Sequence, residues 1–247
     1  MKTLLVGYGN MGHEVERVLA ARGHAVVSRV DPIGGQVASL EALGPGGADV
    51  AIEFSLPGAV VDNARQYARL GVNAVVGTTG WYERRAEVER IVGDAGIGYL
   101  YGPNFSLGVH MFYRLVAAAT RLVNPIDDYD ILGFEAHHRR KKDSPSGTAL
   151  AIAEVILANS TRKKRLATER LDRAVEPDEL HIASVRGGTF PGTHTVSFDC
   201  AADTIELTHT ARTRGGFALG AVMAAEWLQR RNGFFNVDAF IDEILKP

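Results

Sequence analysis

Short apolar runs alternate with amphipathic segments along the first part of the chain. The runs are TLLV, AVVSRV, DVAIEFS, NAVVGTT and IGYLYG, and their length and composition are typical of buried parallel strands. Between them, residues 13–22, 59–70 and 82–94 place apolar side chains at helical spacing. Regular alternation of strands and helices predicts a parallel, doubly wound sheet, in which ligands bind beyond the carboxyl ends of the strands.

The pattern changes in the second half of the chain. A helical stretch over 109–122 leads to the strand YDILGFEAHH, and LHIASVRGG, GTHTVSFDC and DTIELTHTA then alternate with a period of two. These runs predict an α+β second domain with a mixed or antiparallel sheet, one face of which is open for self-association. An Ala-rich apolar helix over 217–229 follows, and we expect it to return to the first domain.

A glycine-rich turn comes directly after the first strand. Its glycines allow a tight turn and a close approach of the backbone to a pyrophosphate, and the following helix presents free N–H groups to the anion. Strand, glycines, helix and second strand occur in the order of a Rossmann-type dinucleotide site. The residues of this turn are Gly7, Tyr8, Gly9, Asn10, Met11 and Gly12.

The second strand ends at an acid, Asp31, which is placed to accept hydrogen bonds from the adenosine ribose. A carboxylate there favours NADH, because it repels the 2′-phosphate of NADPH. Arg29 lies two residues earlier and can offset that repulsion, so NADPH stays open as a second cofactor. Two further turns at strand ends are candidate walls for the nicotinamide half, and they contain Gly77, Thr78 and Thr79, and Gly102, Pro103, Asn104 and Phe105.

Composition narrows the class of protein. The chain has 247 residues, 46% of them hydrophobic, and a formal net charge of −2, which argues against general binding to nucleic acids or membrane surfaces. One cysteine, Cys200, excludes an intramolecular disulfide and suits a reducing compartment. No apolar stretch reaches the roughly 20 residues that span a bilayer. We therefore expect a soluble cytoplasmic protein with neither nucleic acid nor membrane as a partner.

The stretch EAHHRRKKDSPSGTAL, which follows a strand, admits several interpretations. Its single basic cluster lacks the wide surface and interleaved aromatic residues of a nucleic-acid site. The adjacent His137 and His138 point to opposite faces of a strand, so they rarely chelate one ion, and we expect no metal site. A solvated loop remains the simplest interpretation of Arg139, Arg140 and Lys142.

The second half of this stretch favours an anion receptor. Pro145 and Gly147 form a rigid turn, and Ser146, Thr148 and the following N–H groups form a nest at the start of a helix. Together with a lysine and two imidazoles, the nest predicts a receptor for carboxylates with a proton source beside it. We expect Asp143 to restrain the lysine or to cap the helix.

These residues closely resemble the signature of the bacterial dihydrodipicolinate reductases, also called 4-hydroxy-tetrahydrodipicolinate reductases. The family pattern is E-x-H-H-x-x-K-x-D-x-P-S-G-T-A, and every fixed position is met. The blocks VGYGNMG, GTTGW, PNFSLGV, SVRGGTFPGTH and HTARTRGGFALGA are similar to the family's other blocks in the same order, so the resemblance covers nearly the whole chain. The interval between Asp31 and DVAIEFS is short for the family, which alters the wall beside the adenosine.

The resemblance implies a homotetrameric enzyme of diaminopimelate and lysine biosynthesis. Such an enzyme uses NAD(P)H to reduce 4-hydroxy-tetrahydrodipicolinate, through dihydrodipicolinate, to tetrahydrodipicolinate. By position, His137 matches the proton donor and Lys141 the lysine that assists protonation. His138, Gly147 and Thr148 match residues that hold the substrate carboxylates. The cofactor segments match Gly7 to Gly12, Asp31, Gly77 to Thr79 and Gly102 to Phe105, and Arg214 matches an arginine near the hinge between the domains.

On this basis we divide the chain into a discontinuous dinucleotide-binding domain, residues 1–105 and 215–247, and a substrate-binding and oligomerisation domain, residues 106–214. Two other functions are compatible with a dinucleotide site. One is another Rossmann-type amino-acid or imine dehydrogenase, which would not need the complete His-His to Gly-Thr spacing. The other is a catalytically silent dinucleotide sensor, which would not need His137 or Lys141.

Overall fold

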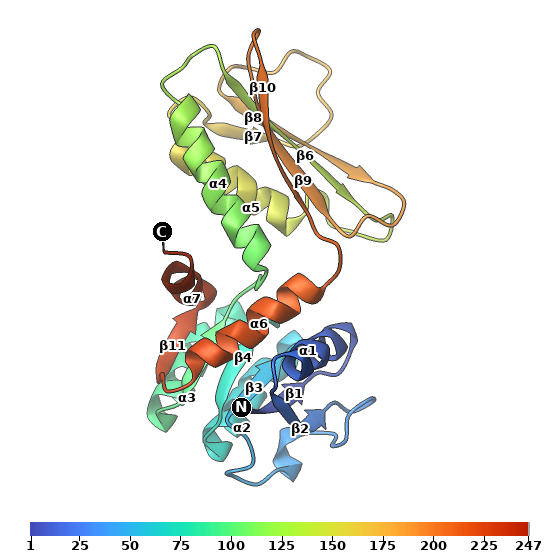
Figure 1. Ribbon diagram of the computed structural model, residues 1–247, viewed down its shortest axis with the longest axis vertical. Helices are drawn as coiled ribbons and strands as arrows, with labels where there is room; N and C mark the ends of the chain where they lie inside the picture. The colour runs from blue at the N-terminus through green and yellow to red at the C-terminus, as the bar shows by residue number, and fades with distance from the viewer. Residues whose placement is uncertain (247) are drawn as a thin grey trace. The chain divides into compact units, whose positions relative to one another are not determined.

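The computed structural model describes residues 1–246 of the chain. The chain divides into two compact units, of which the first contains Met1–Leu107 and the segment from Arg214 onward, and the second contains Gly108–Thr213. Figure 1 shows the elements of each unit in the colours of their position along the chain. Among the described residues, no helix has both the length and the apolar character needed to cross a membrane.

The first unit is built on a six-stranded sheet in which every pair of neighbouring strands is parallel. Its strand order is β11-β5-β4-β3-β1-β2, so the chain order reverses between β1 and β3. Helices pack on both faces, and strands β3 and β5 are therefore buried along their whole length. The strands are β1 (Lys2–Val6), β2 (Ala25–Val30), β3 (Val50–Glu53), β4 (Asn73–Val76), β5 (Gly98–Tyr101) and β11 (Gly233–Asn236).

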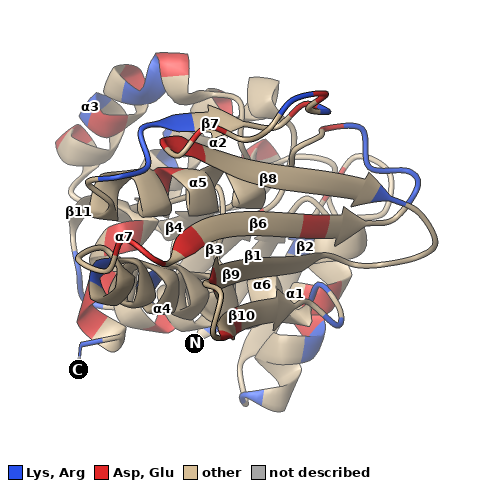
Figure 2. Cartoon of the chain, turned by 90° about the horizontal axis from the view of Figure 1, so that it is seen from above, with Lys and Arg blue, Asp and Glu red and all other residues tan. Residues whose placement is uncertain are grey.

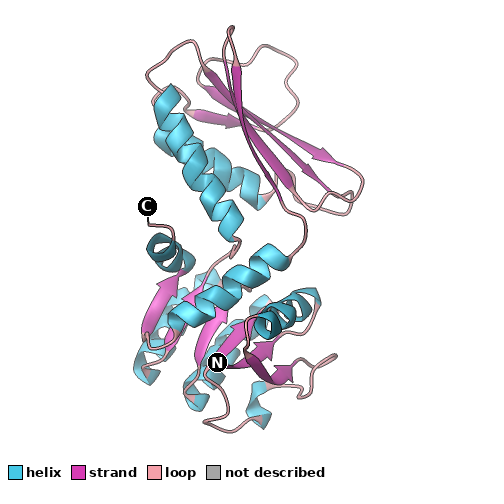
Figure 3. Ribbon diagram, viewed as in Figure 1, coloured by secondary structure: helices cyan, strands magenta, loops and turns pink. Residues whose placement is uncertain are grey.

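Two apolar cores lie on opposite faces of this sheet because neighbouring strand residues point to opposite sides. One core joins the sheet to α2 (Val60–Leu70) and α3 (Arg85–Ala95), and the other joins it to α1 (Asn10–Ala21), α6 (Gly215–Leu228) and α7 (Val237–Ile244). Leu4 belongs to the first core and Leu5 to the second. Figure 3 shows these helices in cyan around the magenta strands. Short 3₁₀ turns complete the unit at Leu40–Ala42, Pro57–Ala59 and Tyr82–Arg84.

The second unit has a mixed five-stranded sheet in the order β10-β9-β6-β8-β7. Strands β6, β8 and β7 run parallel to one another, whereas β9 and β10 are antiparallel to their neighbours. Both helices cover the same face of this sheet, where Phe112, Ile152 and Phe198 share one core. The elements are α4 (Leu107–Val123), β6 (Asp130–His137), α5 (Gly147–Asn159), β7 (Arg165–Ala167), β8 (Glu179–Arg186), β9 (Thr193–Asp199) and β10 (Thr204–Thr210).

The other face of the mixed sheet has no helix of its unit on it, and it exposes large apolar side chains. Leu132 and Phe134 alternate with buried residues along β6, and both are about two-fifths exposed. Val185 of β8 is half exposed and lies on the same face. Contiguous exposed apolar side chains are typical of a protein interface.

The predicted fold class is confirmed, because a doubly wound parallel sheet is joined to a unit with a mixed sheet. The boundaries of individual elements agree less well with the prediction. Helix α1 begins at Asn10, inside the glycine motif, whereas the apolar pattern placed its start at residue 13. Strand β7, strand β11 and helix α7 were not predicted, since each is too short to give a clear periodic pattern.

Candidate active site

A cavity of about 420 Å³ opens in the first unit beyond the carboxyl ends of β1, β3 and β4. It lies where the order of the strands reverses, which is the usual ligand site of doubly wound sheets. The glycine turn and the turn after β4, both predicted to bind the cofactor, contribute to its lining. Its lining residues are Gly9, Asn10, Met11, Phe54, Ser55, Pro57, Gly77, Thr78, Thr79 and Arg214.

The glycine turn fits a dinucleotide pyrophosphate. Gly7 has a φ of +84°, and a Cβ there would lie 2.1 Å from the carbonyl oxygen of Phe54. A Cβ at Gly12 would lie 2.5 Å from the carbonyl oxygen of Gly7, so α1 packs tightly against the turn. A Cβ at Gly9 would meet no atom within 4 Å. The turn is therefore closed behind Gly7 and open over Gly9, and the first amides of α1 are available to an anion.

Asp31 is held in place by the backbone. Its carboxylate accepts hydrogen bonds from the amides of Tyr8 at 2.9 Å, Ile33 at 2.9 Å and Gly34 at 3.0 Å. The bonds from Gly34, Tyr8 and Ile33 hold the pKa of Asp31 below its ordinary value. The carboxylate is thus ionised near neutral pH and fixed beside the glycine turn.

The residues of the turn after β5 lie near two different cavities. Gly102 and Pro103 line a separate cavity of about 240 Å³ together with Tyr82, Arg85 and Val237. The amide oxygen of Asn104 accepts a hydrogen bond from the Ser106 backbone, and Phe105 is buried with its ring centroid 6.5 Å from that of Phe54. Of this turn, Phe105 is therefore the residue in contact with the wall of the glycine-turn cavity.

In the second unit, a buried carboxylate organises the predicted catalytic motif. Glu135 and His137 are two residues apart on β6, so their side chains leave the same face of the strand. Glu135 is fully buried, and its Oε2 lies 3.2 Å from Nδ1 of His137. His194 is paired with Glu135 across β6 and β9, and its Nε2 lies 3.4 Å from the same oxygen.

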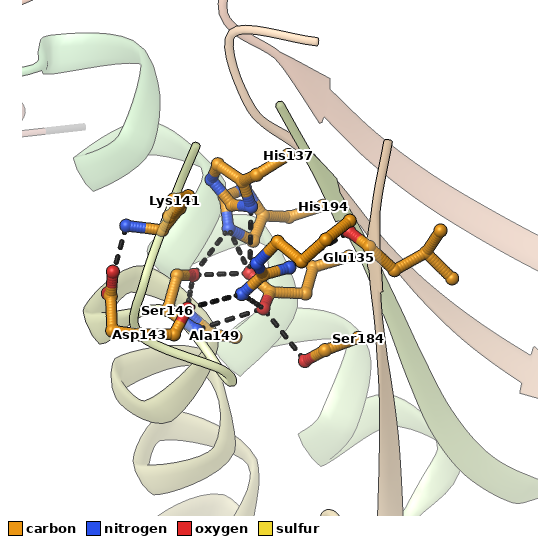
Figure 4. Close-up of polar contacts among 10 residues, drawn as sticks. Glu135, His137, Lys141, Asp143, Ser146, Ala149, Ser184 and His194 are labelled. Atoms are coloured by element: carbon orange, nitrogen blue, oxygen red, sulfur yellow. Dashed lines mark hydrogen bonds and ion pairs between the residues drawn. The ribbon is translucent and has the colours of Figure 1, made fainter. Parts of the chain in front are cut away.

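Four further donors surround the Glu135 carboxylate (Figure 4). Its Oε1 accepts hydrogen bonds from the Ser146 amide at 2.9 Å, Ser184 Oγ at 2.8 Å and Arg186 Nη2 at 2.7 Å, and its Oε2 accepts one from Ser146 Oγ. Burial raises the pKa of Glu135, but the hydrogen bonds from His194, Ser146, Arg186 and Ser184 outweigh it and hold the pKa far below its ordinary value. Glu135 is therefore a buried, ionised anchor.

The side chain of His137 is tightly packed. The side chain is almost fully buried, and a Cβ at Gly192 would lie 2.9 Å from its Nε2. Burial lowers the pKa of His137 to about 4, against the attraction of Glu135 and with help from the nearby side chains of His194, Lys141 and Arg186. In the protein without substrate, His137 is consequently neutral at pH 7.

The basic loop after β6 is fastened at both ends. The His138 amide donates to the Phe190 carbonyl at 2.9 Å, and Arg186 Nη2 donates to the Asp143 carbonyl at 2.6 Å. Within the loop, Lys141 Nζ lies 2.9 Å from Asp143 Oδ2, so Asp143 restrains the lysine as expected. Figure 2 shows this loop in blue beyond the carboxyl ends of β6 and β8. Its other cations, Arg139, Arg140 and Lys142, are exposed.

Ser146 uses its hydrogen-bonding groups within the protein and not in the predicted anion nest. It is the N-cap of α5, its Oγ accepts the Ala149 amide at 3.1 Å, and its own amide is bonded to Glu135. Gly147 is exposed and Thr148 half-buried. The amides that remain for an anion are thus those of Gly147 and Thr148, at the start of α5.

Glu135, His137 and His194 also form a donor set of the kind that binds metals, with one ligand atom from each within 4.8 Å of the others. The positive charge that such a set attracts is already supplied by Arg186, which pairs with the same carboxylate. We therefore interpret the cluster as a network of close polar contacts around Glu135, in which Ser146 Oγ links the carboxylate to Nε2 of His194.

Several residues of these sites were not singled out from the sequence. The sequence pattern assigned no role to Glu135, although its spacing from His137 places both on one strand face. Ser184, Arg186 and His194 lie in β8 and β9, far along the chain, and only strand pairing brings them to Glu135. Phe54, Ser55 and Pro57 follow β3, and they line the glycine-turn cavity because β3 lies next to β1 in the sheet.

Comparison with known families matches both units of the chain. Residues 1–105 match the family model described as "Dihydrodipicolinate reductase, N-terminus", and residues 108–241 match "Dihydrodipicolinate reductase, C-terminus". A 4-hydroxy-tetrahydrodipicolinate reductase of Christiangramia forsetii is 37% identical over 246 residues, which is 100% of both chains. One of Methanosarcina barkeri is 37% identical over 217 residues, covering 85% of this chain and 81% of the relative.

Solved structures share the fold. A dipicolinate-bound dihydrodipicolinate reductase from Paenisporosarcina sp. TG-14 superposes with a TM-score of 0.75 over 97% of this chain and 98% of that one, at 20% identity. An amine dehydrogenase from Mycobacterium smegmatis superposes with a TM-score of 0.56 over 96% and 95%, at 14% identity. At these identities the likeness concerns the fold alone.

Proposed function

The chain belongs to the dihydrodipicolinate reductase family, and we propose that it reduces 4-hydroxy-tetrahydrodipicolinate, through dihydrodipicolinate, to tetrahydrodipicolinate. It is an NAD(P)H-dependent oxidoreductase of diaminopimelate and lysine biosynthesis. The first unit is the dinucleotide-binding domain and the second the substrate-binding and oligomerisation domain. Membership of this family sets aside the alternative of an unrelated amino-acid or imine dehydrogenase, whose likeness is limited to the fold.

NADH is the favoured cofactor in this proposal, and NADPH is the weaker one. When bound, the reduced nicotinamide supplies a hydride. The glycine turn receives its pyrophosphate, and Asp31 accepts hydrogen bonds from the free 2′-hydroxyl of the adenosine ribose. Three backbone amides keep Asp31 ionised, and a fixed negative charge repels a 2′-phosphate.

The substrate is a small dicarboxylate, and the loop after β6 is suited to hold it. Lys141 presents an ammonium group, the amides of Gly147 and Thr148 lie at a helix N-terminus, and His138 adds an imidazole. Ser146 contributes by fixing this helix N-terminus through its hydrogen bonds to Glu135. Fixed donors of this kind bind carboxylates without reorganising during the reaction.

His137 donates the proton that follows hydride addition, and Lys141 screens the negative charge that develops. The observation that supports this assignment best is the buried Glu135–His137 pair. A pKa of about 4 means that His137 holds little positive charge by itself, so a dianionic substrate beside it is what makes protonation favourable. The proton donor therefore becomes charged in the complex with substrate.

The proposal also includes the assembly and the location of the protein. We propose a homotetramer whose subunits associate through the exposed sheet face of Leu132, Phe134 and Val185. A cytoplasmic location suits a nicotinamide-dependent biosynthetic enzyme with a single free thiol, Cys200.

The test is a coupled assay with freshly generated 4-hydroxy-tetrahydrodipicolinate, in which oxidation of NADH and of NADPH is followed in parallel. We expect turnover with both cofactors and a higher kcat/KM with NADH. Absence of oxidation with either cofactor would contradict the proposed activity and favour a dinucleotide sensor. A higher kcat/KM with NADPH would contradict the cofactor assignment only.

A further inference from the structure

Arg29 and Glu16 form an ion pair at the adenosine end of the cofactor site. Arg29 is in β2, two residues before Asp31, and Glu16 is in α1, the helix that begins at the glycine turn. These two elements lie side by side (Figure 1). Arg29 Nη2 pairs with Glu16 Oε1, and Arg29 Nε lies 3.2 Å from Glu16 Oε2, so the contact is bidentate.

The rest of the guanidinium is also engaged. Its Nη1 donates to Gln36 Oε1 at 3.1 Å, and its carbon lies 5.6 Å from the ring centroid of Tyr8. The Tyr8 hydroxyl in turn donates to Glu16 Oε2. The hydrogen bond from Arg29 lowers the pKa of Glu16, so the pair is ionised at neutral pH. About a quarter of each side chain is exposed, which leaves the pair within reach of a ligand at the ribose.

Arg29 matters for the cofactor because no other cation is available on this part of the chain. Between Gly23 and Asp49 it is the only Lys or Arg in the sequence. A 2′-phosphate is normally accommodated by an arginine beside the ribose acid. Here the charges of Glu16 and Arg29 cancel, and Asp31 leaves one net negative charge where the 2′-phosphate of NADPH would lie.

We propose that Glu16 is a specificity-determining residue, which disfavours NADPH by holding Arg29 in an ion pair and away from the 2′-phosphate. This inference rests on the proposed use of a nicotinamide dinucleotide, and it adds a second negative group to the effect of Asp31. Glu16 needs no contact with the cofactor for this role, because it acts through Arg29. Removing its charge frees a guanidinium that can pair with the phosphate.

Glu16→Gln is the direct test, since glutamine keeps the size of the side chain and an acceptor for the Tyr8 hydroxyl. Dissociation constants for NADH and NADPH are measured by nicotinamide fluorescence in the wild type and the variant. A single charge-assisted hydrogen bond to phosphate is enough to lower the ratio of the NADPH to the NADH dissociation constant by about tenfold. The same ratio is measured for adenosine 2′,5′-bisphosphate against 5′-AMP, which reports on the ribose end alone.

Two further variants separate a specificity role from a structural one. Glu14→Gln removes an exposed acid of the same helix that pairs with Arg17, and we expect it to leave both ratios unchanged. Glu16→Gln combined with Arg29→Ala should lose the gain in NADPH binding. If Glu16→Gln leaves the ratios at the wild-type value, or weakens both nucleotides equally, the inference is wrong.

The result is separable from that of the reductase assay. Binding ratios are read without any substrate, so a shift in Glu16→Gln supports the inference even if the chain fails to reduce 4-hydroxy-tetrahydrodipicolinate. Conversely, turnover by the wild type together with unchanged ratios in the variant overturns this inference and leaves the proposed activity intact.

Discussion

The Oε2 atom of Glu135 lies 3.2 Å from Nδ1 of His137, the residue two positions farther along β6. This carboxylate also pairs with Arg186 at 2.7 Å and receives the backbone amide that begins the turn into α5. One buried charge thus contacts the proposed proton donor, the arginine that holds the end of the basic loop, and the start of the helix proposed to bind a substrate carboxylate. A change at Glu135 should therefore affect stability and catalysis together.

We expect Glu135→Gln to lower the free energy of unfolding by about 3 kcal/mol, because it leaves the mostly buried Arg186 without its counter-charge. Turnover should fall by about tenfold or more as His137 loses its partner. Ser184→Ala is a milder variant for comparison. It removes one hydrogen bond to the carboxylate and should lower the free energy of unfolding by about 1 kcal/mol. Urea unfolding and the coupled assay measure both effects, and an unchanged midpoint for Glu135→Gln would contradict the anchoring role.

Gly192→Ala should impair catalysis by moving the His137 ring. The added Cβ would lie 2.9 Å from His137 Nε2, and the φ of +154° is unfavourable for alanine. We expect kcat to fall by about tenfold or more, with the dissociation constant for NADH unchanged. Gly187→Ala is the control, since a Cβ there meets no atom within 4 Å. Equal kcat values for the two variants would show that Gly192 does not position the ring.

Stability should fall as the pH is lowered from 6.5 towards 4. His137 titrates at about 4 in the folded chain and near 6.5 when unfolded, so the unfolded chain binds more protons in this interval. The loss attributable to His137 reaches about 3 kcal/mol at the lower limit. His209, whose pKa is also lowered by burial, adds a slope of the same sign. Urea titrations at several pH values should therefore give a shallower slope for His137→Asn, and equal slopes would exclude a buried neutral His137.

His137→Ala and Lys141→Ala should each lower kcat by about a hundredfold, as is typical when a positioned acid or its cationic partner is removed. Binding of NADH should be unaffected, because neither residue belongs to the first unit, where we propose that the dinucleotide binds. Arg140→Ala, an exposed cation of the same loop, is the matched control and should retain wild-type turnover. Near-normal turnover of His137→Ala or Lys141→Ala would mean that the roles are wrongly assigned.

Phe134→Glu should disrupt assembly. A charge in the centre of the exposed sheet face opposes burial of Leu132 and Val185 in a subunit interface. Light scattering after size exclusion is expected to show a tetramer for the wild type and smaller species for the variant. Leu122→Glu changes an exposed leucine of α4 and should leave the mass unchanged. A wild-type mass for Phe134→Glu would place the interface elsewhere.

The sequence by itself determined the family, the class of fold and most of the residues that we propose to touch the ligands. It could do so because these depend on local chemistry: glycines where the backbone must approach a phosphate, an acid at a strand end, and a motif with fixed spacing from Glu135 to Thr148. Alternation of apolar runs was enough to predict the doubly wound sheet, since period and length are properties of neighbouring residues.

Only the tertiary structure decided which residues support the proposed ligand contacts. Strand pairing brings Ser184, Arg186 and His194 to Glu135, and no local pattern in the sequence indicates the register of β6 with β8 and β9. Ser146 illustrates the difference, because its place in the motif predicted a contact with substrate, whereas its amide and hydroxyl are bonded to Glu135. Likewise, Arg29 was an available cation in the sequence and became a paired one when α1 brought Glu16 beside it. A charge is neutralised by the residues that lie near it in space, and the fold determines which residues those are.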